Sequence, residues 1–239
     1  MKRMLGILAA VAALLIVVRV MLRSREGRYS SYASSPEIPA TQQSAGASFT
    51  YNFDSDAVGA MPAMFHSART GKGAGSKWFV AADPTAPSKP NVVAQTSADT
   101  TDYRFPLLIA DEGSFKDLEL SVRFKPVSGE VDRAGGLVFR LKDANNYYVV
   151  RVNALEDNCR LYHLINGSRR QFAGANFKVT PGEWHELRFE CVGNKIICYY
   201  DGAKKIEATD DTFQDAGKVG LSTKADSVTY FDDLRVTAK

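Results

Sequence analysis

The sequence of 239 residues is long enough for one sizeable domain or two small ones, and its hydrophobic fraction of 45% and charged fraction of 24% are ordinary for a globular protein. The formal net charge of +3 is unevenly distributed, because residues 1–28 carry a balance of +5 and the remaining residues a balance of −2. The nearly neutral remainder argues against a nucleic-acid-binding surface, and the basic start of the chain suits anionic lipid headgroups.

The chain begins with an apolar segment. Two basic residues precede fifteen uninterrupted apolar or glycine residues at 4–18, and a helix over residues 4–22 would be roughly 28 Å long, close to the thickness of a bilayer core. We therefore predict a single transmembrane anchor at residues 1–23. A cleaved signal peptide is the alternative, although the small-x-small sequence at residues 31–33 lies far beyond the apolar stretch.

A polar segment follows the predicted anchor. Residues 24–48 are rich in Ser, Ala, Gln and Pro and show no apolar periodicity, which predicts a flexible linker. Basic residues flank both ends of the apolar segment, so the distribution of charge alone does not decide the orientation in the membrane.

From residue 49 to residue 239 the sequence alternates between apolar and polar residues. This period of two is typical of half-buried strands, and short turn sequences rich in Gly, Asn and Asp separate the runs. The clearest alternating sets are Phe49, Tyr51 and Phe53; Leu118, Leu120, Val122 and Phe124; Leu137, Phe139 and Leu141; and Leu187, Phe189 and Cys191. We predict one all-β domain, an antiparallel sandwich of two sheets, over residues 49–239.

Three cysteines are too few for a disulfide framework, and we expect them to be buried small hydrophobic residues. Cys191 and Cys198 flank a predicted hairpin turn at Gly193-Asn194. That turn places Cys191 opposite Ile196 and Cys198 opposite Phe189, so the two thiols are diagonal neighbours, and a disulfide would require a different register.

Three stretches together carry a resemblance to a known fold. They are GGLVFRLKDANNYYVVRVN at 135–153, PGEWHELRFECVGNKIICYYDG at 181–202 and GKVGLSTKADSVTYFDDLRV at 217–236. They resemble the jelly rolls of the concanavalin A-like and laminin G-like type, above all the bacterial 3-keto-disaccharide hydrolase-like, or family 16-like glycoside hydrolase, domains. The resemblance implies a jelly-roll fold and an extracytoplasmic domain, facing the periplasm from a single-pass inner-membrane anchor. It implies little about function, because most of the matching residues are core and turn positions.

The nearest candidate for catalysis is a strand with two glutamates. Family 16 glucanases use the motif Glu-x-Asp-x-Glu, and this chain has Glu186-Leu187-Arg188-Phe189-Glu190. Arg188 replaces the central Asp, and its charge favours ionised carboxylates, whereas a general acid must hold a proton. Four residues of a straight strand also span about 13 Å, and a retaining pair needs roughly 5–5.5 Å. We therefore expect no catalytic residues here.

Aspartates near both ends of the domain form the candidate metal site. Many jelly-roll carbohydrate modules tie the first strand to the last through a structural Ca²⁺, and the resemblance implies that Asp54, Asp56 and Asp232 could supply its oxygen ligands. Ordinary turn-capping and surface aspartates are the other interpretation, and it stays open.

One predicted sheet face is the candidate ligand-binding surface. If Tyr148, Val150 and Val152 face the core, alternation places Tyr147, Val149, Arg151 and Asn153 on the opposite face, and we expect Arg140 beside them on the neighbouring strand. Aromatic, arginine and asparagine side chains on one face suit a sugar or a protein partner, and a solvated sheet face is the plain alternative.

These observations favour a membrane-anchored, extracytoplasmic and non-catalytic module. Its expected partners are membrane lipid, through the anchor, and either a glycan or neighbouring subunits of a membrane protein complex; a nucleic acid is not expected. Two other functions stay open: a glycoside hydrolase-type enzyme acting on keto- or simple disaccharides, which the family resemblance implies, and a lipid-surface protein that uses the basic residues beside the anchor.

Overall fold

The computed structural model describes residues 48–239, which form fifteen strands joined by turns and loops. The predicted anchor at residues 1–23 lies outside the described residues, and so does the predicted linker at 24–48 except for residue 48 itself. Within residues 48–239 there is no helix with the length and apolar character needed to cross a membrane.

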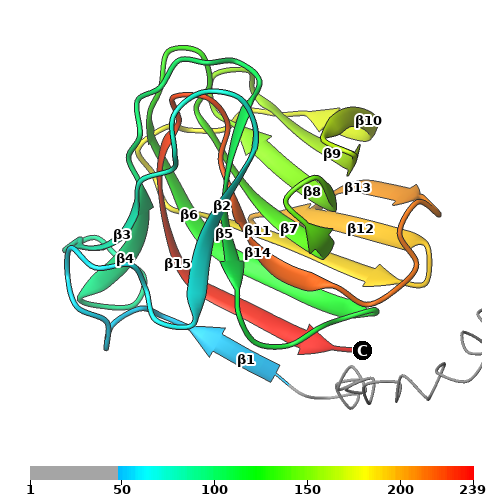
Figure 1. The fold of residues 1–239 in the computed structure, drawn as a ribbon, viewed down its shortest axis with the longest axis horizontal. Helices are drawn as coiled ribbons and strands as arrows, with labels where there is room; N and C mark the ends of the chain where they lie inside the picture. The colour runs from blue at the N-terminus through cyan, green and yellow to red at the C-terminus, as the bar shows by residue number, and fades with distance from the viewer. Residues whose placement is uncertain (1–47) are drawn as a thin grey trace, which may run out of the picture. The chain divides into compact units, whose positions relative to one another are not determined.

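The strands form two antiparallel sheets that pack face to face (Figure 1). Sheet A has the order β13-β12-β11-β6-β15-β4-β3, with β1 paired to β15, and sheet B has the order β10-β9-β8-β7-β14-β5-β2. The strands of sheet A are β1 (Ser48–Tyr51), β3 (Trp78–Ala82), β4 (Asn91–Gln95), β6 (Leu118–Ser128), β11 (His185–Val192), β12 (Lys195–Tyr200), β13 (Ala203–Thr209) and β15 (Val228–Ala238). The strands of sheet B are β2 (Phe65–Gly71), β5 (Arg104–Ala110), β7 (Ala134–Asp143), β8 (Asn146–Asn153), β9 (Asn158–Ile165), β10 (Ser168–Asn176) and β14 (Lys218–Ser222).

The core lies between the sheets and is built by the alternating residues. On β11, every second side chain from Leu187 to Cys191 is buried, and the residues between them are partly exposed. Phe139 of β7 packs against Phe189 of β11, with ring centroids 4.3 Å apart, and so joins the two sheets. The prediction of an all-β sandwich of two antiparallel sheets is confirmed. Each sheet buries one apolar face against the other, and this burial stabilises the pair.

The cysteines lie as the hairpin turn predicted. Phe189 pairs with Cys198, Cys191 pairs with Ile196, and all three thiols are free and buried. Burial raises the pKa of the Cys159 thiol to about 12 and that of Cys191 to about 11. Protonated thiols are poor nucleophiles and poor metal ligands, so these cysteines serve as core residues.

The outer face of sheet B is concave and largely apolar. Its residues form a second buried cluster, separate from the core between the sheets: Phe105, Leu107, Ile109, Val138, Leu141, Tyr147, Val149, Tyr162 and Leu164. Contacts across this face draw distant strands together, since Thr70 of β2 hydrogen-bonds the Tyr147 hydroxyl of β8 at 2.9 Å and Tyr103 reaches the β9–β10 turn. Sheet B therefore curls around a second core.

Candidate binding site

A cluster of charged and polar side chains lies at one end of the concave face. We call it the charged cluster, and its members are Asp102, Asp132, Arg151, Asn153, Glu156, Asn158 and Lys224. The strands contribute only Arg151 and Asn153, at the end of β8, and Asn158, at the start of β9. The others come from the segment before β5, the β6–β7 loop, the β8–β9 turn and the segment after β14. The cluster is thus assembled by the tertiary fold.

Arg151 is the centre of the charged cluster. Its Nη1 lies 3.2 Å from Asp132 Oδ1, and its Nη2 lies 2.8 Å from both Glu156 Oε2 and Asn158 Oδ1. The residue is 6% exposed, and its guanidinium is held in one orientation by Asp132 and Asn158, which are buried, and by the more exposed Glu156. Hydrogen bonds between ionised groups in such surroundings are about twice as strong as neutral ones.

Asp132 is the fully buried carboxylate of the cluster. Its Oδ1 accepts hydrogen bonds from Arg151 and, at 2.6 Å, from Asn153 Nδ2, and its Oδ2 pairs with the Lys224 ammonium. Burial raises the pKa of Asp132, and the hydrogen bond and charge of Lys224 oppose that effect. A buried carboxylate is tolerated only when donors satisfy it in this way.

The backbone of the β6–β7 loop is fixed by Asp226. Its carboxylate accepts hydrogen bonds from the N–H groups of Glu130, Val131 and Asp132 at 2.7, 3.1 and 3.0 Å. Partial burial works against ionisation of Asp226, and these backbone donors outweigh it and lower its pKa. The ionised carboxylate therefore holds Asp132 in position against Arg151.

Two aromatic rings form the wall beside the charged cluster. The guanidinium of Arg169, on β10, lies between the rings of Phe105 and Tyr162, with its central carbon 4.6 and 4.5 Å from their centroids. Arg151 lies 5.8 Å from the Tyr162 ring on the cluster side. These side chains line a partly open cavity of about 10 Å³, together with Tyr147, Val149, Leu164, Ser222, Thr223 and Lys224. That volume holds about one water molecule.

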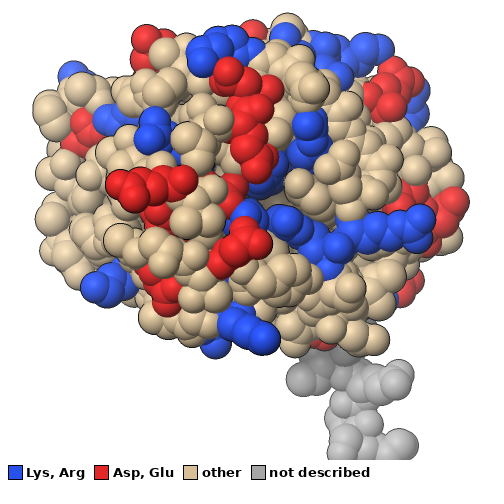
Figure 2. Space-filling model, turned by 90° about the horizontal axis from the view of Figure 1, so that it is seen from above, with Lys and Arg blue, Asp and Glu red and all other residues tan. Residues whose placement is uncertain are grey.

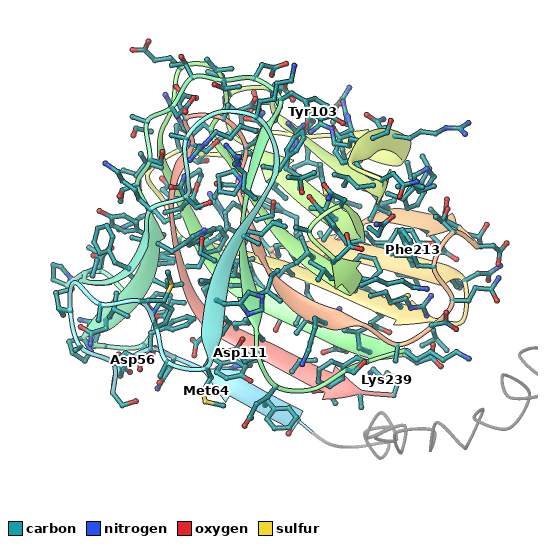
Figure 3. All side chains as sticks on the ribbon, viewed as in Figure 1. Asp56, Met64, Tyr103, Asp111, Phe213 and Lys239 are labelled. Atoms are coloured by element: carbon teal, nitrogen blue, oxygen red, sulfur yellow. The ribbon has the colours of Figure 1, made fainter. Side chains whose placement is uncertain are left out.

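Two carboxylates of the cluster reach the surface. The side chains of Glu156 and Asp102 are 46% and 74% exposed. One oxygen of each is engaged, by Arg151 and Asn158 for Glu156 and by Lys224 for Asp102, and no donor within residues 48–239 reaches the other oxygen. Figure 2 views the molecule from the side on which Figure 3 labels Tyr103, and acidic and basic groups are interspersed there. Polar acceptors in fixed positions are therefore available to a neutral ligand.

Alternation along β8 correctly predicted which side chains share the outer face of sheet B. Tyr147 lines the floor of the cavity, Arg151 and Asn153 belong to the charged cluster, and Tyr148 lies in the core between the sheets. Whether these residues bind a ligand stays a prediction. No local pattern in the sequence marks Asp132, Glu156 and Lys224, because each lies in a loop that only the fold brings to β8.

The prediction that Arg140 lies beside Arg151 on the outer face of sheet B is wrong. A bulge shifts the register of β7 after Phe139, and Arg140 adopts a positive φ of 45°. Its guanidinium is 1% exposed and donates to the backbone carbonyls of Lys116, Phe213 and Gly193 at 2.7 Å each. Arg140 therefore ties loops together at another part of the sandwich and does not lie beside Arg151.

The residues of the expected calcium site do not fit a Ca²⁺ ion. Asp232 is buried, and its carboxylate already accepts hydrogen bonds from Ser88 N and Oγ, both at 2.8 Å. The backbone carbonyls of Asp54 and Asp56 point instead at the Asn91 side-chain amide, at 3.3 and 3.1 Å. Among residues 48–239, no group of three or more His, Cys, Asp or Glu side chains is arranged to hold a metal ion. N–H and O–H donors thus occupy the oxygens of all three aspartates that a cation would need.

The two glutamates of β11 lie on the outer face of sheet A. Arg188 bonds Glu190 at 2.7 Å and Glu119 of β6 at 3.3 Å, and it stacks on the ring of Tyr199 at 3.7 Å. The predicted strand is confirmed, and within residues 48–239 the ion pairs of Arg188 are with Glu190 of the same strand and Glu119 of β6, and not with Glu186. Arg188 therefore holds Glu119 and Glu190 in an ion-paired ladder on this face.

Residues 66–237 match the family described as a 3-keto-alpha-glucoside-1,2-lyase-like domain. The chain belongs to this family. It is also 29% identical over 117 residues to the levanase of Bacillus subtilis (strain 168). That match covers 48% of this chain and 17% of the levanase, so the chain corresponds to a small part of that relative. The predicted family resemblance is confirmed.

Solved structures support the same fold. The carbohydrate binding module CBM66 from Bacillus subtilis is 20% identical, with a TM-score of 0.59 over 73% of this chain and 96% of that module. The Bacillus licheniformis β-glucanase is 14% identical, with a TM-score of 0.55 over 82% of this chain and all of the other. At these identities the similarity shows a shared jelly-roll architecture, and function must be argued from the site.

Proposed function

We propose that the concave face of sheet B is a glycan-binding site and that the chain acts as a non-catalytic binding module. The observation that carries this proposal is the charged cluster around Arg151, set beside the aromatic rings of Phe105 and Tyr162. A few fixed polar groups next to an aromatic wall are typical of sugar sites, where rings stack on the sugar and polar groups bind its hydroxyls. The family and the carbohydrate-related names of its relatives support this proposal.

The ligand that fits best is neutral. Three cations, Arg151, Arg169 and Lys224, and three carboxylates, Asp102, Asp132 and Glu156, lie at this site, so their charges balance. The free oxygens of Glu156 and Asp102 would accept hydrogen bonds from sugar hydroxyls, whereas they would repel a uronate or a phosphate.

Catalysis is the second candidate function, because the family description refers to a lyase acting on keto-glucosides. Glu156 and Asp102 each have a free oxygen that could take a proton from such a substrate, and the hydrogen bond from Lys224 lowers the pKa of Asp102. Partial burial would favour the neutral form of Glu156, but the Asn158 hydrogen bond and the charge of Arg151 lower the pKa of Glu156. Asp132 is already held by three donors. Weak bases and an occupied carboxylate favour binding over proton transfer.

The cellular placement of the module is part of the proposal and rests on the sequence. We propose that residues 1–23 anchor the chain in the inner membrane and present the domain to the periplasm, where it would bind its glycan alone or beside a membrane protein partner. Sequencing the N-terminus of the membrane-bound protein tests this point. A mature protein that starts near residue 34 would replace the anchor by a cleaved signal peptide.

The binding function is tested by comparing Glu156→Gln with Glu190→Gln. Both substitutions remove a carboxylate charge beside an arginine, but Glu190 lies on the other sheet. Calorimetric titration with fructan and β-glucan oligosaccharides should show binding that Glu156→Gln weakens about tenfold, the value of one charge-assisted hydrogen bond. Glu190→Gln should bind like the unmodified chain. Product formation from a 3-keto-glucoside that stops in Glu156→Gln would instead establish the enzyme.

A further inference from the structure

The edge strand β10 and the β9–β10 turn close over the concave face of sheet B. Tyr103 directly precedes β5. Its hydroxyl donates to the carbonyl of Gly167 at 2.8 Å and accepts from the backbone N–H of Arg169 at 2.8 Å. The Tyr103 side chain thus bridges two parts of sheet B that the strand order keeps far apart. Figure 3 labels Tyr103 where the strands of this sheet end.

Arg169 fills the space between the aromatic rings without a polar partner. Its guanidinium contacts the rings of Phe105 and Tyr162, and no hydrogen bond or ion pair from residues 48–239 reaches its side chain. A guanidinium held only by two aromatic faces is bound weakly compared with the hydrogen-bonded Arg151 beside it.

The closed face is too small to admit a sugar. The cavity of about 10 Å³ is lined by side chains from inner strands and the segment after β14, apart from Arg169, which comes from the edge strand β10. Sites that enclose a small ligand have volumes of several hundred Å³. Among the lining strands β10 alone is an edge strand, hydrogen-bonded only to β9, and none of its residues is fully buried, although Phe172, Ala173 and Ala175 pack against the core; such a strand opens at a lower free-energy cost than an inner strand.

We propose that the edge strand β10, with the β9–β10 turn, is a lid latched by Tyr103 and Arg169, and that a neutral sugar ring replaces the Arg169 guanidinium between Phe105 of β5 and Tyr162 of β9 when the lid opens. The apolar face of a sugar ring stacks on aromatic rings as the flat guanidinium does. The nature of the ligand rests on the proposed function, whereas the lid itself rests on the contacts of Tyr103 and Arg169.

The test uses the full chain with Arg169→Ala and Tyr103→Phe, and Arg170→Ala is the matched control because Arg170 is the exposed next residue of the same strand. Hydrogen exchange of the β10 amides should become about tenfold faster in both latch variants and stay unchanged in the control. Stopped-flow titration with the same fructan and β-glucan oligosaccharides should show faster association and about tenfold tighter binding, since the latch no longer competes with the sugar.

Each other outcome has a definite meaning. Unchanged exchange in both latch variants would overturn the lid, whatever the binding result. Weaker sugar binding by Arg169→Ala would also overturn it, because Arg169 would then contact the sugar directly. If neither the unmodified chain nor any variant binds these sugars, the proposed function fails, and the exchange measurements still decide whether β10 is latched.

Discussion

At the scale of the residue, Asn91 connects the segment after β1 to β4. Its side-chain amide donates to the carbonyls of Asp54 and Asp56, and Asp54 Oδ1 accepts from the Asn91 backbone N–H at 3.0 Å. Asn91 is 5% exposed, and its hydrogen bonds to these partly buried carbonyls are largely shielded from solvent. We expect Asn91→Ala to lower the free energy of unfolding by about 2–3 kcal/mol, the cost of unsatisfied buried acceptors.

Urea unfolding measures this change, with Asn52→Ala as the control because Asn52 is exposed in the same segment. Excess chelator should leave the melting temperature of the unmodified chain unchanged, since N–H donors satisfy the oxygens. A melting temperature that rises with added Ca²⁺ would show that Asp54, Asp56 and Asp232 do bind the ion.

Individual residues also show where sequence reasoning reaches its limit. Alternation placed Tyr147, Arg151 and Asn153 on one face because side chains of a regular strand strictly alternate. It failed for Arg140, because a bulge changes the direction of a side chain without leaving a mark in the pattern of apolar residues. It could not indicate Arg169, because β10 contributes to the site only after it folds over a distant part of the chain.

At the scale of the element, the β6–β7 loop owes its shape to two residues. Gly129 has a φ of +146°, and a side chain there would collide with the carbonyl of Asp132. Asp226 then binds three successive N–H groups of the loop. We expect Asp226→Ala to destabilise the chain by about 1–3 kcal/mol and to weaken sugar binding, because the freed loop no longer holds Asp132 against Arg151.

Thermal unfolding and sugar titration together check this prediction, and Asp211→Ala, at an exposed position in another loop, is the control. A variant that loses stability but binds with unchanged affinity would show that the position of Asp132 does not matter for the ligand.

The individual strands also explain why the fold was easier to predict from the sequence than the binding site was. Strands such as β6 and β11 bury one face and therefore alternate clearly. All seven residues of β5 are buried, because one face packs in the core and the other in the second apolar cluster, so β5 shows no alternation. The concave second core, and with it the location of the site, follows from the curl of sheet B and could not be predicted from any single strand.

At the scale of the whole molecule, the carboxylates make stability depend on pH in a predictable direction. Hydrogen bonds and nearby cations, acting against partial burial in most cases, lower the pKa of Asp83, Asp102, Glu156, Asp210 and Asp226. Burial raises the pKa of Asp132 and Asp232. Groups of the first kind favour the folded state above their unfolded pKa of about 4, and groups of the second kind oppose it there.

The lowered carboxylates are the larger set, so we expect the melting temperature to be nearly constant from about pH 7 to pH 5 and to fall below about pH 4. The stability that depressed pKa values contribute is lost as the pH falls through the folded-state values, and protonation of Asp132 and Asp232 offsets only part of the loss. Calorimetry between about pH 7 and pH 2 measures the profile. In Asp226→Asn the decline should be shallower, because one of the contributing carboxylates is gone. A melting temperature that rises on acidification would mean that the two buried aspartates outweigh all the others.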